Sequence, residues 1–151
     1  MSTNRRDAIR MSDAEVVAFL GAQKSLQVGT IERDGSIHLS TLWFALVDGS
    51  IVFETYTKSQ KIRNLERDPR ITVLAEDGDV YEKLRGVMIK GTARLVSEPA
   101  EVHPLALAVL TRNQPELPRE VLEQAAEHMA TKRTAVVVEP VKTVSWDHTK
   151  L

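Results

Sequence analysis

Cysteine is absent from this chain of 151 residues, and so is any excess of positive charge. Without cysteine the chain has no thiol nucleophile, no thiolate zinc site and no disulfide framework. Its 20 lysine and arginine residues are balanced by 21 aspartate and glutamate residues, whereas proteins that bind nucleic-acid phosphates normally carry a basic excess. Only 4 histidines are present, which makes a transition-metal site improbable. We therefore expect neither a nucleic-acid partner nor a metal.

Long apolar runs are also missing. No run approaches the ~20 residues that cross a bilayer, and residues 1–6 lead into charged side chains rather than the apolar centre of a signal peptide. We expect a cytoplasmic protein with no membrane partner. The composition, 42% hydrophobic and 27% charged, is that of a globular domain, and the length fits one domain over residues 1–151. Residues 1–11 are expected to form a flexible N-terminal segment.

Local patterns predict a helix followed mainly by strands. Ser12 and Glu15 have capping-box spacing, which predicts a helix over residues 13–22. Asp-Gly pairs at 34–35 and 48–49 predict tight hairpins between strand-like runs. A short helix over 59–66 should end before Asp68-Pro69. Two more helices are expected near 100–111 and 118–130. The expected strands are 26–32, 37–47, 51–56, 70–75, 84–96 and 134–146.

Glycine and proline positions suggest that these strands curve into a barrel. Gly86 and Gly91 interrupt the longest strand, and Pro140 interrupts the last. Such residues in strands favour bends, bulges or an edge position. Six strands with helices inserted late and at the periphery predict an α+β fold around a closed or nearly closed β-barrel.

The segment over residues 55–64 carries the strongest chemical signal. It lies where a strand ends and a helix begins, so free backbone N–H groups and the positive end of the helix dipole point outward. Hydroxyl groups and positive charges gather there: Thr57, Ser59, Lys58, Lys61 and Arg63. This combination is typical of a phosphate site built without a glycine-rich loop. The spacing alone fits equally well an N-capped helix with solvated lysines.

The same segment resembles the phosphate-binding stretch of the pyridoxamine-phosphate-oxidase-like split β-barrel superfamily. The matching residues are Phe53, Thr55, Ser59-Gln60-Lys61, Asn64-Leu65 and Asp68-Pro69-Arg70. Asp77-Gly78-Asp79 and the ending Ser145–Leu151 resemble the actinobacterial flavin/deazaflavin oxidoreductase branch, whose members bind coenzyme F-420 or FMN. The resemblance extends from about Ser12 to Leu151. It implies a six-stranded split barrel and a homodimer with the cofactor pocket at the subunit interface.

The resemblance also implies a role for individual positions. Ser59, Gln60 and Lys61 match residues that hold the cofactor phosphate, and Gln60 replaces an arginine of the oxidase proper, which removes a bidentate contact. Lys58 restores some of that charge, and Thr55 matches a threonine near the cofactor chain. The strand over 38–44 matches the one along the ring system. Four of its residues should face the ring: Ser40, Thr41, Leu42 and Trp43. Alternating core packing is the other reading of Trp43 and Phe44.

The resemblance gives the C-terminus a role as well. Trp146 would close the pocket from the opposite subunit, and His148 is a candidate proton donor. The alternative reading is an aromatic plug beside a solvent-exposed tail. Lys58, Arg63 and Lys24 are candidate partners for the anionic polyglutamate tail of F-420.

The basic residues with which the oxidase grips its substrate are missing, so oxidation of vitamin B6 is not expected. The expected function is that of an oxidoreductase. It would use F-420, the preferred cofactor, or FMN to transfer hydride to or from a small unsaturated or quinone-like substrate. A non-catalytic protein that carries, stores or senses the cofactor is the alternative, and a plain phosphometabolite-binding module is a third reading.

Overall fold

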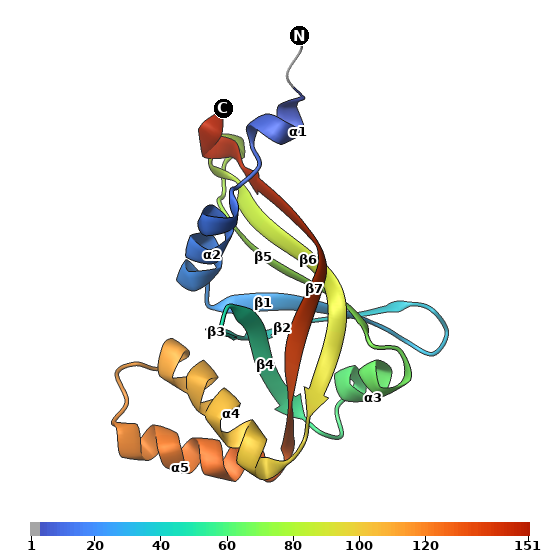
Figure 1. Cartoon of the computed structure of the whole chain (residues 1–151), viewed down its shortest axis with the longest axis vertical. Coiled ribbons are helices and arrows are strands. Elements are labelled where there is room, and N and C mark those ends of the chain that lie inside the picture. Colours follow the sequence, from blue (N-terminus) through green and yellow to red (C-terminus); the bar gives the residue numbers. More distant parts are fainter. Residues whose placement is uncertain (1–3) are drawn as a thin grey trace.

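The computed structural model describes residues 4–151, in which seven strands form a single curled antiparallel sheet (Figure 1). Its strand order is β2-β1-β5-β6-β7-β4-β3. The strands are β1 (Ser25–Ile31), β2 (Ile37–Trp43), β3 (Ala45–Val47), β4 (Ser50–Tyr56), β5 (Arg70–Asp77), β6 (Arg85–Val96) and β7 (Arg133–Asp147). The helices are α1 (Arg5–Ala8), α2 (Asp13–Ala22), α3 (Gln60–Arg67), α4 (Pro99–Asn113) and α5 (Arg119–Ala130). Short 3-10 turns lie at Tyr81–Lys83 and His148–Lys150.

The sheet has seven strands rather than the expected six, because the run over 37–47 is broken at Phe44. The Phe44 carbonyl accepts hydrogen bonds from Arg112 Nη1 at 2.8 Å and from Asn113 Nδ2 at 3.2 Å. The Arg112 guanidinium also lies 4.4 Å from the centroid of the buried Phe44 ring. Because side chains of α4 bind this carbonyl, Phe44 does not pair with a neighbouring strand. β2 and β3 are therefore separate strands, and they lie at opposite edges of the sheet.

Several boundaries follow the local signals closely. Both hydrogen bonds of the capping box at Ser12 are present, and α2 spans the predicted residues. Asp48 and Gly49 both have positive φ, as a two-residue hairpin with the twist of its strands requires. Gly91 pairs with Pro140 at a register shift between β6 and β7, so the predicted irregularity is a bulge. A Cβ on Gly91 would strike the Glu139 carbonyl.

The inner face of the curled sheet forms the main core, together with residues of α2 and α3. On the outer face, α4 and α5 cover β4 and β7 through a second apolar cluster (Figure 1). The outer face of β2 has no such cover. Its side chains Ile37, Leu39 and Trp43 are 64%, 68% and 44% exposed. The helices therefore protect one part of the outer surface and leave an apolar strip on another.

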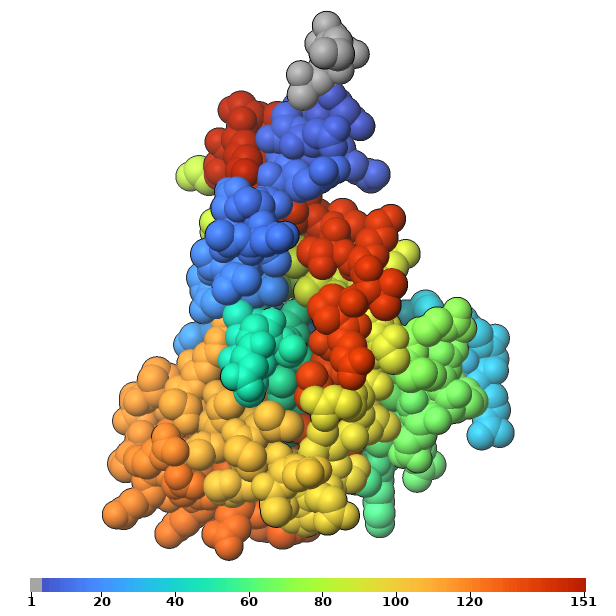
Figure 2. Space-filling model, viewed as in Figure 1, coloured from blue at the N-terminus to red at the C-terminus, as the bar shows by residue number. Residues whose placement is uncertain are grey.

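The first described residues and the C-terminal residues lie together at one end of the molecule (Figure 2). Asp147 N–H donates to the Ile9 carbonyl at 2.7 Å, and Lys150 Nζ donates to Glu15 Oε1 at 2.9 Å. The hydrogen bond from Lys150, together with those from Ser12, lowers the pKa of Glu15 to about 2. Within the segment expected to be flexible, residues 5–8 form α1 and Met11 is buried. Residues 1–3 lie outside the described residues.

None of the helices in residues 4–151 is long and apolar enough to cross a membrane.

Candidate functional site

The turn between β4 and α3 brings the predicted phosphate-binding residues together. Ser59 N–H donates to the Tyr56 carbonyl at 2.9 Å and closes this turn. Ser59 is the N-cap of α3 rather than its first residue, and its hydroxyl oxygen accepts from Ile62 N–H at 3.3 Å. The hydrogen of the Ser59 hydroxyl therefore remains available to donate a hydrogen bond to a ligand. Thr57 and Lys58 are exposed beside it. We call Thr57–Lys61 the anion cradle.

Lys61 is the charged residue of the anion cradle whose surroundings are unusual. It is half-buried in the first turn of α3, and desolvation by burial lowers the pKa of its ammonium group. Across residues 4–151, no carboxylate lies within ion-pair distance of it. The positive end of the helix dipole adds to the same field. A bound anion would compensate both, so these residues fit a phosphate group.

Gln60 is tied into the protein interior. Its Nε2 donates to Asn64 Oδ1 at 2.8 Å, and Asn64 Nδ2 donates to Thr30 Oγ1 at 3.0 Å. Asn64 and Thr30 are fully buried. This chain of hydrogen bonds holds α3 against β1 and fixes the direction of the helix axis. Asn64 was recognised in the sequence only as part of a motif, and nothing there identified Thr30 as its partner.

The four predicted ring-facing residues lie on an edge strand. Side chains of β2 alternate: Ser40 and Leu42 are half-buried on the inner face, whereas Thr41 and Trp43 are exposed on the outer face. A planar ring therefore cannot contact all four side chains from one face. Because β2 pairs only with β1, every second residue of β2 directs its backbone N–H and C=O away from the sheet. A ring along this edge would meet backbone groups as well as side chains.

Two buried polar atoms on the inner face of β2 lack partners. Within the described part of the chain, His38 Nδ1 and Ser40 Oγ form no hydrogen bond. His38 lies opposite Thr30 in the β1–β2 ladder, so this face adjoins the hydrogen bonds that anchor α3. Buried polar groups are nearly always satisfied in folded proteins. Unpaired atoms of this kind suit the polar edge of a heterocyclic ring.

Thr55 and Trp146 do not join the anion cradle within one chain. Thr55 is 7% exposed and lies opposite Thr134 inside the sheet. The indole of Trp146 lies over Gly86. Arg133 pairs with Tyr56 at the cradle, and Trp146 lies 13 residue steps further along β7, or about 40 Å of strand at ~3.3 Å per residue. Trp146 therefore lies far from the cradle of its own chain.

His148 belongs to the same distant end. Its Nδ1 lies 2.6 Å from the Tyr81 carbonyl, which makes this nitrogen the donor. The imidazole also packs edge-on against the Tyr81 ring, with centroids 4.6 Å apart. These contacts hold the C-terminal residues of the chain against the turn that contains Tyr81.

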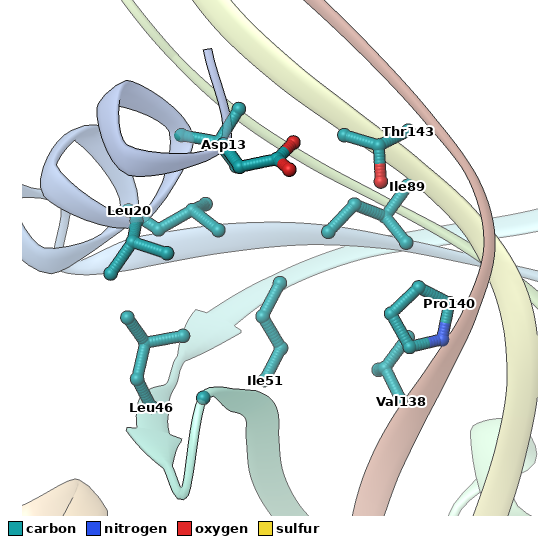
Figure 3. A pocket seen from close by; sticks show the side chains of 11 residues that line it. Asp13, Leu20, Leu46, Ile51, Ile89, Val138, Pro140 and Thr143 are labelled. Atoms are coloured by element: carbon teal, nitrogen blue, oxygen red, sulfur yellow. The ribbon is translucent and has the colours of Figure 1, made fainter.

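One of the hollows in the surface lies between α2 and the curled sheet (Figure 3). This apolar pocket of about 210 Å³ lies between α2 and the inner faces of β4, β6 and β7. Leu20, Leu46 and Ile51 line it, with Asp13 and Thr143 on the upper side in Figure 3. It includes none of the predicted cofactor-binding residues.

A larger hollow of about 690 Å³ adjoins the anion cradle. We call it the basic hollow. Its lining residues are Tyr56, Thr57, Lys58, Ser97, Pro99, Ala130, Thr131, Lys132 and Arg133. Sequence reasoning identified only Thr57 and Lys58 here. The basic pair Lys132-Arg133, at the point where the last strand begins, was the available signal for the others.

Acidic and imidazole side chains do not gather into a metal site in the part of the chain that the structure describes. No group of three or more histidine, aspartate or glutamate residues there could hold an ion.

Comparisons with known proteins identify the family and the fold of this chain. A family model described as Pyridoxamine 5'-phosphate oxidase matches residues 12–147. The conserved hypothetical protein Rv2991 from Mycobacterium tuberculosis is 40% identical, with 98% of this chain and 92% of that chain covered and a TM-score of 0.90. A structure described as an F420 reductase is 22% identical, with 83% and 93% covered and a TM-score of 0.66.

HutZ from Vibrio cholerae, described as a heme storage protein, is 15% identical, with 88% of this chain and 94% of that chain covered and a TM-score of 0.68. At these low identities, the likeness to HutZ and to the F420 reductase shows the fold alone. A search of curated proteins found no match.

Proposed function

Since this chain belongs to the pyridoxamine 5'-phosphate oxidase family, we propose that it binds coenzyme F-420, or alternatively FMN, and acts as an oxidoreductase. Its substrate would be a small unsaturated or quinone-like compound. When bound, the cofactor supplies a ring that accepts or donates hydride. The protein's own part is to hold the phosphate, orient the ring and exclude water from it.

The observation that carries this proposal is the environment of the Lys61 ammonium group. A half-buried ammonium group at a helix N-terminus, with a lowered pKa and no carboxylate partner in residues 4–151, favours a bound anion. The Ser59 hydroxyl and the free N–H groups of the first turn of α3 provide neutral donors beside it. A phosphate monoester or diester suits this set of donors.

The edge strand β2 supports the second half of the proposal. In our proposal, the ring lies along β2 and contacts its outward backbone groups, His38 Nδ1 and Ser40 Oγ. Leu42 would contribute apolar contact from the same face as Ser40. The polar atoms would fix the ring's orientation, and apolar contact would keep water from the reacting position.

We also propose a homodimer. The exposed strip Ile37, Leu39 and Trp43 would pair with a second copy, because α4 and α5 already cover the other part of the outer face. About 40 Å of strand separates Trp146 from the cradle of its own chain. A second copy is therefore what could bring Trp146 and His148 to a cofactor.

A non-catalytic carrier is the second candidate function. It is favoured by the position of His148, whose Nδ1 is engaged by the Tyr81 carbonyl far from the cradle. A carrier would bind the cofactor without turning over any substrate. Turnover of the reduced cofactor with a panel of quinones and enones distinguishes it from an enzyme.

The direct test is a fluorescence or absorbance titration with F-420 and with FMN. Lys61→Gln should weaken binding by about 1.5–3 kcal/mol, the scale of a hydrogen bond to a charged group. The matched control Lys90→Gln removes an exposed lysine of β6 outside the cradle and should leave affinity unchanged. If neither cofactor binds the wild type at tens of micromolar, the proposal is wrong.

A further inference from the structure

Three segments that are distant in the sequence build the basic hollow: the end of β4, the β6–α4 connection and the α5–β7 connection (Figure 1). Thr57 N–H donates to the Lys132 carbonyl at 2.9 Å and joins two of these segments. Behind the lining, a chain of hydroxyl groups joins all three. Thr134 Oγ1 lies 2.9 Å from Thr57 Oγ1 and 3.1 Å from Ser97 Oγ. The hollow thus has a hydrogen-bonded frame.

One wall of the basic hollow is held in place by contacts within the protein, and most of its positive charge is compensated. The Arg133 guanidinium lies 4.4 Å from the centroid of the Tyr56 ring. Arg133 Nη1 also donates to Glu54 Oε2 at 2.8 Å, and the Glu54 side chain is only 9% exposed. Arg133 and Tyr56 therefore form a rigid surface, and most of the guanidinium charge is compensated.

The charges of Lys58 and Lys132 are not compensated in this way. Both side chains are exposed, and no carboxylate in residues 4–151 lies within ion-pair distance of either. They come from two different segments, yet both line the same hollow. Two ammonium groups and the hydroxyl of Thr57 around a concave surface favour an anionic group. The volume lies within the range of small-molecule sites.

The basic hollow is continuous with the anion cradle. Thr57 and Lys58 belong to both, and the hydrogen bond from Ser59 N–H to the Tyr56 carbonyl folds the connecting turn tightly. Consecutive Cα atoms are about 3.8 Å apart. A single ligand of modest length can therefore reach from one site into the other.

We propose that the basic hollow binds a second anionic group of the ligand whose phosphate lies in the anion cradle. This inference rests on the proposed function. It selects ligands with two anionic groups, such as the phosphodiester and carboxylate tail of F-420 or the two phosphates of FAD. FMN carries one phosphate and leaves the hollow unused. Lys132 is then a specificity-determining residue.

This assignment changes the expected partners of the anionic tail. Lys24 and Arg63 were candidates beside Lys58, but neither lines the hollow. Lys132 takes their place, because the α5–β7 connection brings it to the cradle. Lys90, an exposed lysine of β6 that does not line the hollow, serves as the matched control for a change at Lys132.

The test compares the affinities of F-420, FAD and FMN for the wild type, Lys132→Ala, Lys132→Arg and Lys90→Ala. Lys132→Ala should lose about five- to tenfold in affinity for a ligand with two anionic groups, and no more than about twofold for FMN. Lys132→Arg should restore the affinity, and Lys90→Ala should behave as wild type. The salt dependence of binding should become shallower only for Lys132→Ala.

The outcomes separate the two proposals. Binding of none of the three cofactors to the wild type overturns the proposed function and this inference with it. Binding with an equal loss, or no loss, for all three in Lys132→Ala overturns the inference alone. A loss confined to F-420 identifies the carboxylate tail as the second group, and a loss confined to FAD identifies the diphosphate.

Discussion

The hydrogen-bonded chain from Gln60 through Asn64 to Thr30 gives the sharpest test of how α3 is held. Asn64 is fully buried, donates to the equally buried Thr30 hydroxyl at 3.0 Å and accepts from Gln60 at 2.8 Å. Asn64→Ala removes both bonds and leaves the Thr30 hydroxyl buried without its donor. Because α3 carries Lys61 in its first turn, the same change would loosen the anion cradle.

The magnitude follows from the contacts. Two net hydrogen bonds contribute about 1 kcal/mol each, and an unsatisfied buried hydroxyl costs about 1–3 kcal/mol. We expect Asn64→Ala to lower the free energy of unfolding by about 3 kcal/mol. For a chain of this length that corresponds to a fall in Tm of about 6–12 °C. Gln60→Ala, which removes only the exposed end of the chain, should cost less than about 1 kcal/mol.

Urea unfolding at one fixed protein concentration measures these values, since a dimer would make stability depend on concentration. Thr30→Val supplies the partner for a double-mutant cycle. The double variant with Asn64→Ala should lose at least about 1 kcal/mol less than the sum of the single changes, because it leaves no stranded hydroxyl. Two single changes that each cost under about 1 kcal/mol and add simply would refute the reasoning.

Three further predictions concern the charge, the bulge and the exposed strip. Burial lowers the pKa of Lys61, so the affinity for the cofactor should fall as the pH rises toward the ordinary lysine pKa of 10.5. A pH titration of Lys61→Gln should not show this fall. Gly91→Ala would press a Cβ against the Glu139 carbonyl at the bulge; we expect a loss of about 1–3 kcal/mol in urea unfolding, and an unchanged midpoint would contradict it. Leu39→Glu should convert a dimer to monomers in equilibrium sedimentation at little cost to the monomer fold, whereas a monomeric wild type would disprove the dimer.

Features set by neighbouring residues could be predicted from the sequence. The capping box of α2 depends on Ser12 and Glu15, three positions apart, and the hairpin at Asp48-Gly49 depends on the dihedral preferences of its two residues. The bulge at Pro140 follows from the missing N–H of proline. In each case the deciding interaction lies within a few residues.

Features decided by distant contacts could not be predicted. Phe44 leaves the sheet because Arg112, 68 positions away, binds its carbonyl, and no local signal marks that break. The edge position of β2 follows from the pairing of the whole sheet. The four side chains predicted to face the ring do not form one surface, because the alternation of a strand sends Thr41 and Trp43 away from Ser40, and their contact with a ring stays a prediction.

The candidate site also has one part that depends on neighbouring residues and another that depends on distant contacts. The anion cradle is contiguous in the sequence, so its residues were predicted together, although their binding role remains a prediction. Gln60 is held by Asn64 through a helical i, i+4 hydrogen bond that its motif did not reveal. The basic hollow needs three segments to meet, and Lys132 becomes significant only when the fold places it beside Lys58.

A crystal structure with F-420 or FMN bound tests the central claim most directly. We predict cofactor phosphate oxygens within hydrogen-bonding distance, about 2.7–3.2 Å, of Lys61 Nζ and the N–H groups that begin α3, with the ring along β2 near Ser40. A phosphate bound elsewhere, with Lys61 solvated and the edge of β2 uncovered, would contradict the account.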